Sequence, residues 1–263
     1  MIDLDAYCRR VGWTGPRAPT LDVLSGLCLA HTSSIPFENL DILLGQPIKL
    51  DLPSIADKIV NRHRGGYCFE QNTLLQSVLC QIGFRVIPLG ARVRLGVAPD
   101  VQTPRTHMLL RVDLDDGSYI ADVGFGFTPT GPLRLEPGLD QALHLDTYRL
   151  ARQGSQWTLE ILQPGGFAPA YTFNEEPCLP VDYDVANHFT STHPRSFFTL
   201  GPLVMRHDPG NGVRHVLRGR EWSIRRGAEV ETRAVTTPEQ ALHVLAEHFK
   251  LEFPAGTVFR GLD

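Results

Sequence analysis

Residues 64–96, RGGYCFEQNTLLQSVLCQIGFRVIPLGARVRLG, contain a change from one kind of hydrophobic pattern to another. In the first part, the apolar residues recur at the spacing of one helix face, and Gly83 ends the pattern. From about residue 86, apolar residues alternate with polar ones or form short runs, as in strands. This junction predicts an α+β protein with helices before it and an antiparallel sheet after it.

Residues 1–85 continue the helical pattern toward the N-terminus. Thr20 is placed to cap a helix in which Leu21, Leu24 and Cys28 share one face. Ser54 is predicted to cap a second helix that carries Ile55 and ends at the glycine pair 65–66. We therefore predict an N-terminal helical bundle over residues 1–85.

The remainder of the chain is dominated by strand patterns. DDGS (115–118) and RQGS (152–155) each separate two such patterns and predict hairpin turns. Residues 86–190 are therefore predicted to form a central antiparallel β-barrel. Residues 191–263 hold one more hairpin pattern and a helix that Thr237 caps, with Pro238 in its first position. They predict a C-terminal mixed α/β lid.

Composition argues against several classes of function. The 263 residues carry a net charge of −4 and 42% hydrophobic residues, which gives no reason to expect binding to nucleic acid. No apolar stretch approaches the roughly 20 residues that cross a membrane, and the N-terminus lacks a signal peptide pattern, so we expect a cytoplasmic protein without membrane contact. Five irregularly spaced cysteines without a CxxC motif predict neither disulfides nor a zinc site.

Cys68 is the cysteine in an unusual place, because it follows Gly65 and Gly66 and begins a helical pattern. The free N–H groups and partial positive charge of a helix start stabilise a thiolate there, and they could also hold an oxyanion. The glycines would let the backbone approach a ligand closely. Alternatively, the glycines end the previous helix and Cys68 packs inward. This stretch alone leaves both interpretations open.

A reactive cysteine needs a base and a group that orients the base. A hairpin turn at residues 115–117 brings His107 on one strand opposite the region of Asp122 on the next, within about two residues of register. Asp122 stands among apolar neighbours and needs a polar partner, which a histidine N–H supplies. The sequence thus predicts a Cys68, His107 and Asp122 arrangement.

These residues lie in motifs that resemble those of the arylamine N-acetyltransferase family. The motifs are SSIPFENLD (33–41), RGGYCFEQN (64–72), THMLL (106–110) and DVGFG (122–126). The resemblance runs from about residue 5 to about residue 250. It is strong through residue 127 and thin beyond, where FTSTHPRSFF (189–198) is the best anchor. It implies a cysteine-protease-like catalytic core and the order helical bundle, barrel and lid.

The resemblance also implies an activity, which is ping-pong acetyl transfer. Acetyl-CoA would serve as co-substrate, without a permanently bound cofactor or metal. The acceptors would be arylamines, arylhydrazines or N-hydroxyarylamines. By motif, Cys68 would be the nucleophile, His107 its base and Asp122 the residue that holds the tautomer of His107.

The same resemblance implies binding roles for further positions. Phe37 and Phe125 are similar to residues that line the acceptor pocket, although Phe37 fits plain core packing almost equally well. Gly124 and Gly126 resemble a loop along the pantetheine arm, Thr106 would hydrogen-bond the ligand, and Val93 would line the cleft. Asn72 is expected either to hydrogen-bond the triad acid or to be a surface amide.

Three other interpretations of the function remain. A cysteine hydrolase or a transglutaminase-like enzyme uses the same three groups with a different acyl donor or acceptor. A binding module with a decayed site is disfavoured, because all three residues are present. An amide-forming synthase would share the motifs and differ in its acceptor.

Overall fold

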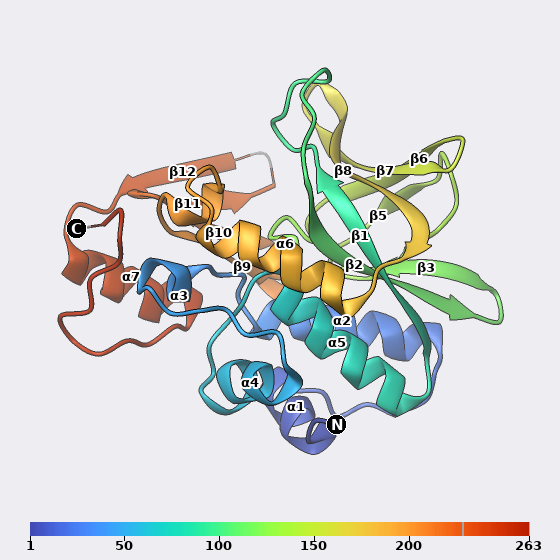
Figure 1. Ribbon diagram of the computed structural model, residues 1–263, viewed down its shortest axis with the longest axis horizontal. Coiled ribbons are helices and arrows are strands. Elements are labelled where there is room, and N and C mark those ends of the chain that lie inside the picture. Colours follow the sequence, from blue (N-terminus) through green and yellow to red (C-terminus); the bar gives the residue numbers. More distant parts are fainter. Residues whose placement is uncertain (228, 263) are drawn as a thin grey trace.

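The computed structural model describes residues 1–227 and 229–262 and has the predicted α+β architecture (Figure 1). The N-terminal helices are α1 (Leu4–Val11), α2 (Leu21–Ser34), α3 (Leu40–Leu43), α4 (Leu52–Ala56) and α5 (Cys68–Ile82), with a π-helical turn at Asp57–Asn61. Thr20 caps α2 as predicted. The predicted cap at Ser54 is wrong, because Asp51 accepts the Ser54 N–H at 2.9 Å and takes the cap position itself.

Eight antiparallel strands form the central sheet in the order β4-β3-β2-β1-β8-β7-β6-β5. Their bounds are β1 (Arg85–Val93), β2 (Arg105–Leu114), β3 (Gly117–Ala121), β4 (Leu133–Arg134), β5 (Asp140–Ala142), β6 (Thr147–Gln153), β7 (Gln156–Gln163) and β8 (Gly166–Pro177). The Gln141 side chain of β5 accepts from the N–H of Arg134 in β4 at 2.7 Å and donates to its carbonyl at 3.1 Å. A side-chain amide therefore joins the two edges of a nearly closed barrel.

The C-terminal part contains α6 (Pro180–Thr192) and a second sheet with order β12-β11-β10-β9. Its strands are β9 (Leu203–Asp208), β10 (Val213–Arg218), β11 (Glu221–Arg226) and β12 (Glu229–Ala234), and α7 (Pro238–Phe249) follows them. Short 3-10 turns lie at Phe197–Thr199 and Pro209–Asn211. Thr237 caps α7 as predicted. The predicted divisions of the chain at residues 85 and 190 stay predictions.

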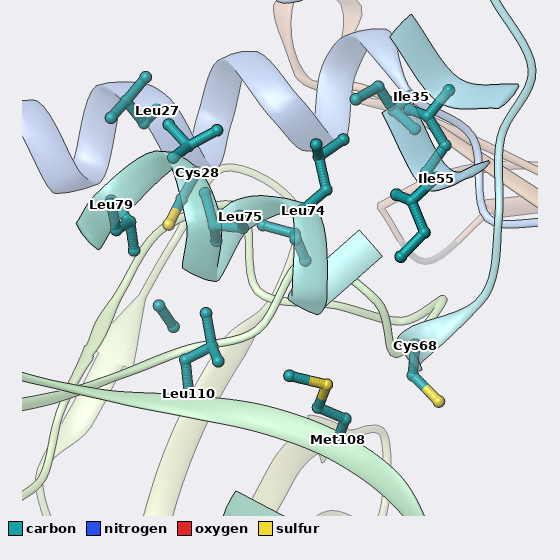
Figure 2. Close-up of a cluster of buried hydrophobic side chains, with 14 of the residues drawn as sticks. Leu27, Cys28, Ile35, Ile55, Cys68, Leu74, Leu75, Leu79, Met108 and Leu110 are labelled. Carbon is teal, nitrogen blue, oxygen red and sulfur yellow. The ribbon is translucent and has the colours of Figure 1, made fainter. Parts of the chain in front are cut away.

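Helix α5 is the centre of the N-terminal core. Figure 2 shows its leucines between side chains of α2 and side chains of β2, including Met108 and Leu110. Leu74, Leu75 and Leu79 are completely buried, and each such burial contributes roughly 1.5–3 kcal/mol. Cys68 lies at the start of the same helix, and its sulfur points away from these leucines (Figure 2). Packing of α5 therefore fixes the position of Cys68 beside the barrel.

Within residues 1–227 and 229–262, no helix is long and apolar enough to cross a membrane.

Candidate active site

The chain around Cys68 is held by close backbone contacts. Cys68 is the first residue of α5, and Tyr67 before it is extended. A Cβ on Gly65 would lie 2.1 Å from the Pro36 carbonyl oxygen, and one on Gly66 would lie 2.9 Å from the Glu70 carboxylate. The protein's own backbone at Pro36 and the buried Glu70 side chain therefore leave no room for larger residues at these positions.

Buried charges reinforce the start of α5. Glu70 accepts the Tyr67 N–H at 3.0 Å and pairs with Lys58 at 2.8 Å. Lys58 also pairs with Asp41 at 2.8 Å, and Asp41 pairs with Arg64 at 2.8 Å. Lys58 and Glu70 are almost fully buried, so each needs its partner. Glu70 is thus both an acid in the first turn of α5 and a member of a buried network of charges.

His107 and Asp122 meet at the end of the β2–β3 hairpin. Leu110 pairs with Ala121, which is the hairpin register that the predicted turn implies. Strand β3 ends one residue before Asp122. The Nε2 atom of His107 lies 2.7 Å from Oδ2 of Asp122. Their exposed fractions are 3% and 1%. A buried carboxylate and imidazole therefore satisfy each other.

Asn72, one turn after Cys68, connects α5 to this pair. Its Nδ2 donates to Oδ1 of Asp122 at 3.0 Å and to the Met108 carbonyl at 2.7 Å. Its Oδ1 accepts the Val123 N–H at 3.1 Å. Asn72 is completely buried, so the interpretation as a surface amide is wrong. This side chain therefore links the helix that carries Cys68 to both strand β2 and the segment after β3 that carries Asp122.

The electrostatics of the pair favour a charged imidazole. Burial by itself would lower the pKa of His107, but the Asp122 carboxylate and the Cys68 thiol, through charge and hydrogen bonds, raise it to about 10. Burial would raise the pKa of Asp122, yet His107, Asn72 and the Gly124 N–H hold it below its usual range. Because Nε2 of His107 is bound to Asp122, Nδ1 is the nitrogen left for the Cys68 thiol. The Cys68 Sγ also lies 3.7 Å from the Thr106 carbonyl oxygen.

The residues for which the resemblance implies binding roles lie at different distances from His107 and Cys68. The Phe125 ring contacts the His107 ring edge-on, with centroids 5.1 Å apart, and Phe125 is half-buried. A Cβ on Gly124 would lie 2.6 Å from the Cα of Cys68, so this segment runs against the cysteine itself. Gly126 has φ of +93°, which favours glycine. Thr106 reaches Cys68 through its backbone carbonyl, while its side chain is half-buried.

Phe37 and Val93 are placed less directly. Phe37 is buried and packs against Phe198 with centroids 6.1 Å apart, and it forms a backbone bridge to Met205 of β9. Val93 is half-buried in β1 opposite Tyr171 of β8. Tyr171 was not predicted from the sequence as part of the site, although its ring centroid lies 4.9 Å from that of His107. Its only signal is an apolar strand pattern far along the chain, which does not indicate contact with His107.

Among the residues that the structure describes, no three His, Cys, Asp or Glu side chains are grouped so as to hold a metal ion.

Comparison with known proteins gives matches over nearly the whole chain. Residues 20–258 match the model of an N-acetyltransferase family. The chain is 40% identical over 256 residues to an arylamine N-acetyltransferase of Mycolicibacterium smegmatis, which covers 95% of this chain and 92% of that protein. It is 40% identical over 210 residues to a Salmonella typhimurium arylamine N-acetyltransferase / N-hydroxyarylamine O-acetyltransferase, covering 80% and 74%.

A solved structure, that of Mycobacterium marinum arylamine N-acetyltransferase in complex with CoA, superimposes with a TM-score of 0.90 at 38% identity. The superposition covers 94% of this chain and 92% of that one.

Proposed function

This chain belongs to the arylamine N-acetyltransferase family, and we propose that it transfers the acetyl group of acetyl-CoA through Cys68 to an arylamine, arylhydrazine or N-hydroxyarylamine. One observation carries the assignment of Cys68. It is the first residue of a helix, and its thiol interacts with the His107 imidazole, which a buried carboxylate holds. Use of CoA is supported by the structural match to a relative in complex with CoA.

In the first half-reaction, the Cys68 thiolate attacks the carbonyl carbon of acetyl-CoA. The bond from Cys68 sulfur to the acetyl carbon forms, the bond from that carbon to the CoA sulfur breaks, and the imidazolium of His107 gives its Nδ1 proton to the departing CoA thiolate. One thioester replaces another, so the step is nearly balanced in energy. The first N–H groups of α5 have no helical carbonyl to bond and are placed to stabilise the oxyanion.

In the second half-reaction, the acceptor nitrogen or hydroxyl attacks the acetyl carbon on Cys68. His107, now neutral, takes the proton that the acceptor loses, and the Cys68 thiolate leaves. Asp122 fixes Nε2 as the protonated nitrogen in both states, so that Nδ1 always faces the reacting atoms. Aromatic amines are weakly basic, and their neutral form is available for the attack at neutral pH.

Intact-protein mass spectrometry tests this assignment. Acetyl-CoA alone should add one acetyl group to the wild type and none to Cys68→Ala, and an arylamine such as an anisidine should remove it. An adduct that only water discharges would indicate a hydrolase or a different acceptor class. No adduct, or turnover that persists in Cys68→Ala, would contradict the mechanism.

A further inference from the structure

His207 of β9 is a buried polar residue that the mechanism above does not use. It is 3% exposed, and its Nε2 lies 2.7 Å from the carbonyl oxygen of Gly126. A carbonyl only accepts, so Nε2 carries the proton and donates it. Among the described residues, the other ring nitrogen of His207 has no hydrogen-bond partner. The hydrogen bond from Nε2 to the Gly126 carbonyl is therefore the one that holds this side chain among the described residues.

The residue directly across from His207 reaches the same segment. Arg214 of β10 pairs with His207 in register, so both side chains leave the same face of the C-terminal sheet. The Arg214 guanidinium lies 5.0 Å above the Phe127 ring and forms a buried ion pair with Asp146 of the barrel. Two neighbouring side chains of the second sheet thus hold residues 126 and 127 from outside the barrel.

The other end of this segment touches the catalytic groups. The Gly124 N–H donates to Asp122 at 3.0 Å, and Gly124 runs against the Cα of Cys68. Phe125 lies between the two fixed ends and contacts His107. Gly126 has φ of +93°, a conformation that glycine adopts readily, and His207 bonds the carbonyl of this residue, one peptide beyond Phe125.

Strand β9 is also joined to the approach to Cys68. Phe37 and Met205 exchange two backbone hydrogen bonds of 2.9 Å, and the Glu38 N–H donates to the Gly66 carbonyl at 3.0 Å. The same strand therefore connects, on one side, to the residues just before Cys68 and, through His207, to the segment after Asp122. This geometry sets the separation between the cysteine and Phe125.

We propose that His207 is a positioning residue, whose hydrogen bond to the Gly126 carbonyl holds Phe125 against His107 and so shapes the site that receives the arylamine. The role of Phe125 in acceptor binding rests on the proposed function. Burial first, and then the charge of Arg214, lower the pKa of His207 to about 3, so the neutral form that donates from Nε2 persists over the working pH range.

Hydrogen–deuterium exchange tests the hydrogen bond independently of any activity. His207→Leu removes the donor and keeps an apolar side chain, while His207→Gln retains an amide donor. Exchange of the peptide that covers residues 123–131 should be roughly fivefold to tenfold faster in the Leu variant, the size expected for one lost hydrogen bond, and close to wild type in the Gln variant. His215→Leu is the matched control, because His215 lies on the same sheet and packs against Trp222 and His248 instead.

Kinetics then test the role in acceptor binding. His207→Leu should raise the arylamine KM by roughly fivefold to tenfold, the effect of one hydrogen bond, while the single acetyl adduct formed from acetyl-CoA persists and Gln restores the KM. Unchanged exchange in His207→Leu, equal effects of Leu and Gln, or the same loss in His215→Leu would overturn the positioning role. A wild type that forms no acetyl adduct would contradict the proposed function, and the exchange result would still decide the hydrogen bond.

Discussion

Substitution of Asp122 by Asn removes the charge that maintains the imidazolium of His107. With Asp122 present, the pKa of His107 is about 10, against an ordinary value of about 6.5. Burial alone would lower this pKa, so the Asp122 carboxylate, together with Cys68, more than offsets the effect of burial. Removing one charge of a buried pair costs roughly 3–5 kcal/mol, so we expect a loss of at least about 100-fold to 1,000-fold in the thiolate–imidazolium pair.

The orientation of His107 changes as well. Oδ1 of residue 122 already accepts from Asn72 and from the Gly124 N–H, so an Asn in this place would direct its NH₂ group toward Nε2 of His107. That nitrogen must then be an acceptor, and the proton moves to Nδ1, on the side of Cys68. A neutral imidazole protonated at Nδ1 cannot take the proton of the thiol. Loss of charge and wrong tautomer act in the same direction.

The assay is the rate at which iodoacetamide alkylates Cys68 near neutral pH, together with the rate of CoA release from acetyl-CoA. Peptide mapping must be used, because Cys80 is exposed and reacts too. Both rates should fall by about 100- to 1,000-fold in Asp122→Asn. Asp116→Asn removes the same charge from the turn of the same hairpin, where the side chain is 55% exposed, and should leave both rates within about twofold. Rates in Asp122→Asn within tenfold of wild type would refute the reasoning.

Stability should show the same coupling with a defined sign. The folded-state pKa of His107 lies above the value of about 6.5 in an unfolded chain. The stabilisation from its protonation is therefore fully present below about pH 6.5 and is lost as the pH rises through about 10. The melting temperature of the wild type should fall more steeply over this range than that of Asp122→Asn. Parallel curves for the two proteins would contradict the coupling.

Two further substitutions test how the site is built. Gly124→Ala places a Cβ 2.6 Å from the Cα of Cys68. Urea titration should show a loss of roughly 1–3 kcal/mol in the free energy of unfolding, and CoA release should show a large loss of acetylation rate. Gly201→Ala, where the nearest atom to the new Cβ is 3.8 Å away, should change neither quantity. Lys58→Met leaves the buried Glu70 carboxylate without its cation and should cost roughly 3–5 kcal/mol in the same titration. Arg62→Met, whose side chain is 58% exposed, should cost less than about 1 kcal/mol, and equal losses would argue against the buried network.

Local chemistry determined much of this protein from the sequence alone. The helix that begins at Cys68, the caps at Thr20 and Thr237 and the two hairpin turns each depend on residues close together in the chain. The meeting of His107 with Asp122 is also nearly local, because one tight turn fixes the register of a hairpin. Family membership followed from short motifs for the same reason.

Tertiary structure decided the contacts between distant segments. Gln141 joins the edges of the barrel, Tyr171 packs on His107, and His207 binds the Gly126 carbonyl 81 residues away. The glycines before Cys68 also acquire their reason only here, since they make room for the Pro36 carbonyl and the Glu70 side chain. Such contacts depend on how whole elements pack, and packing leaves no periodic signal around the residues that it brings together. The sequence therefore singled out Cys68, His107 and Asp122, and the fold determined what holds these residues in place.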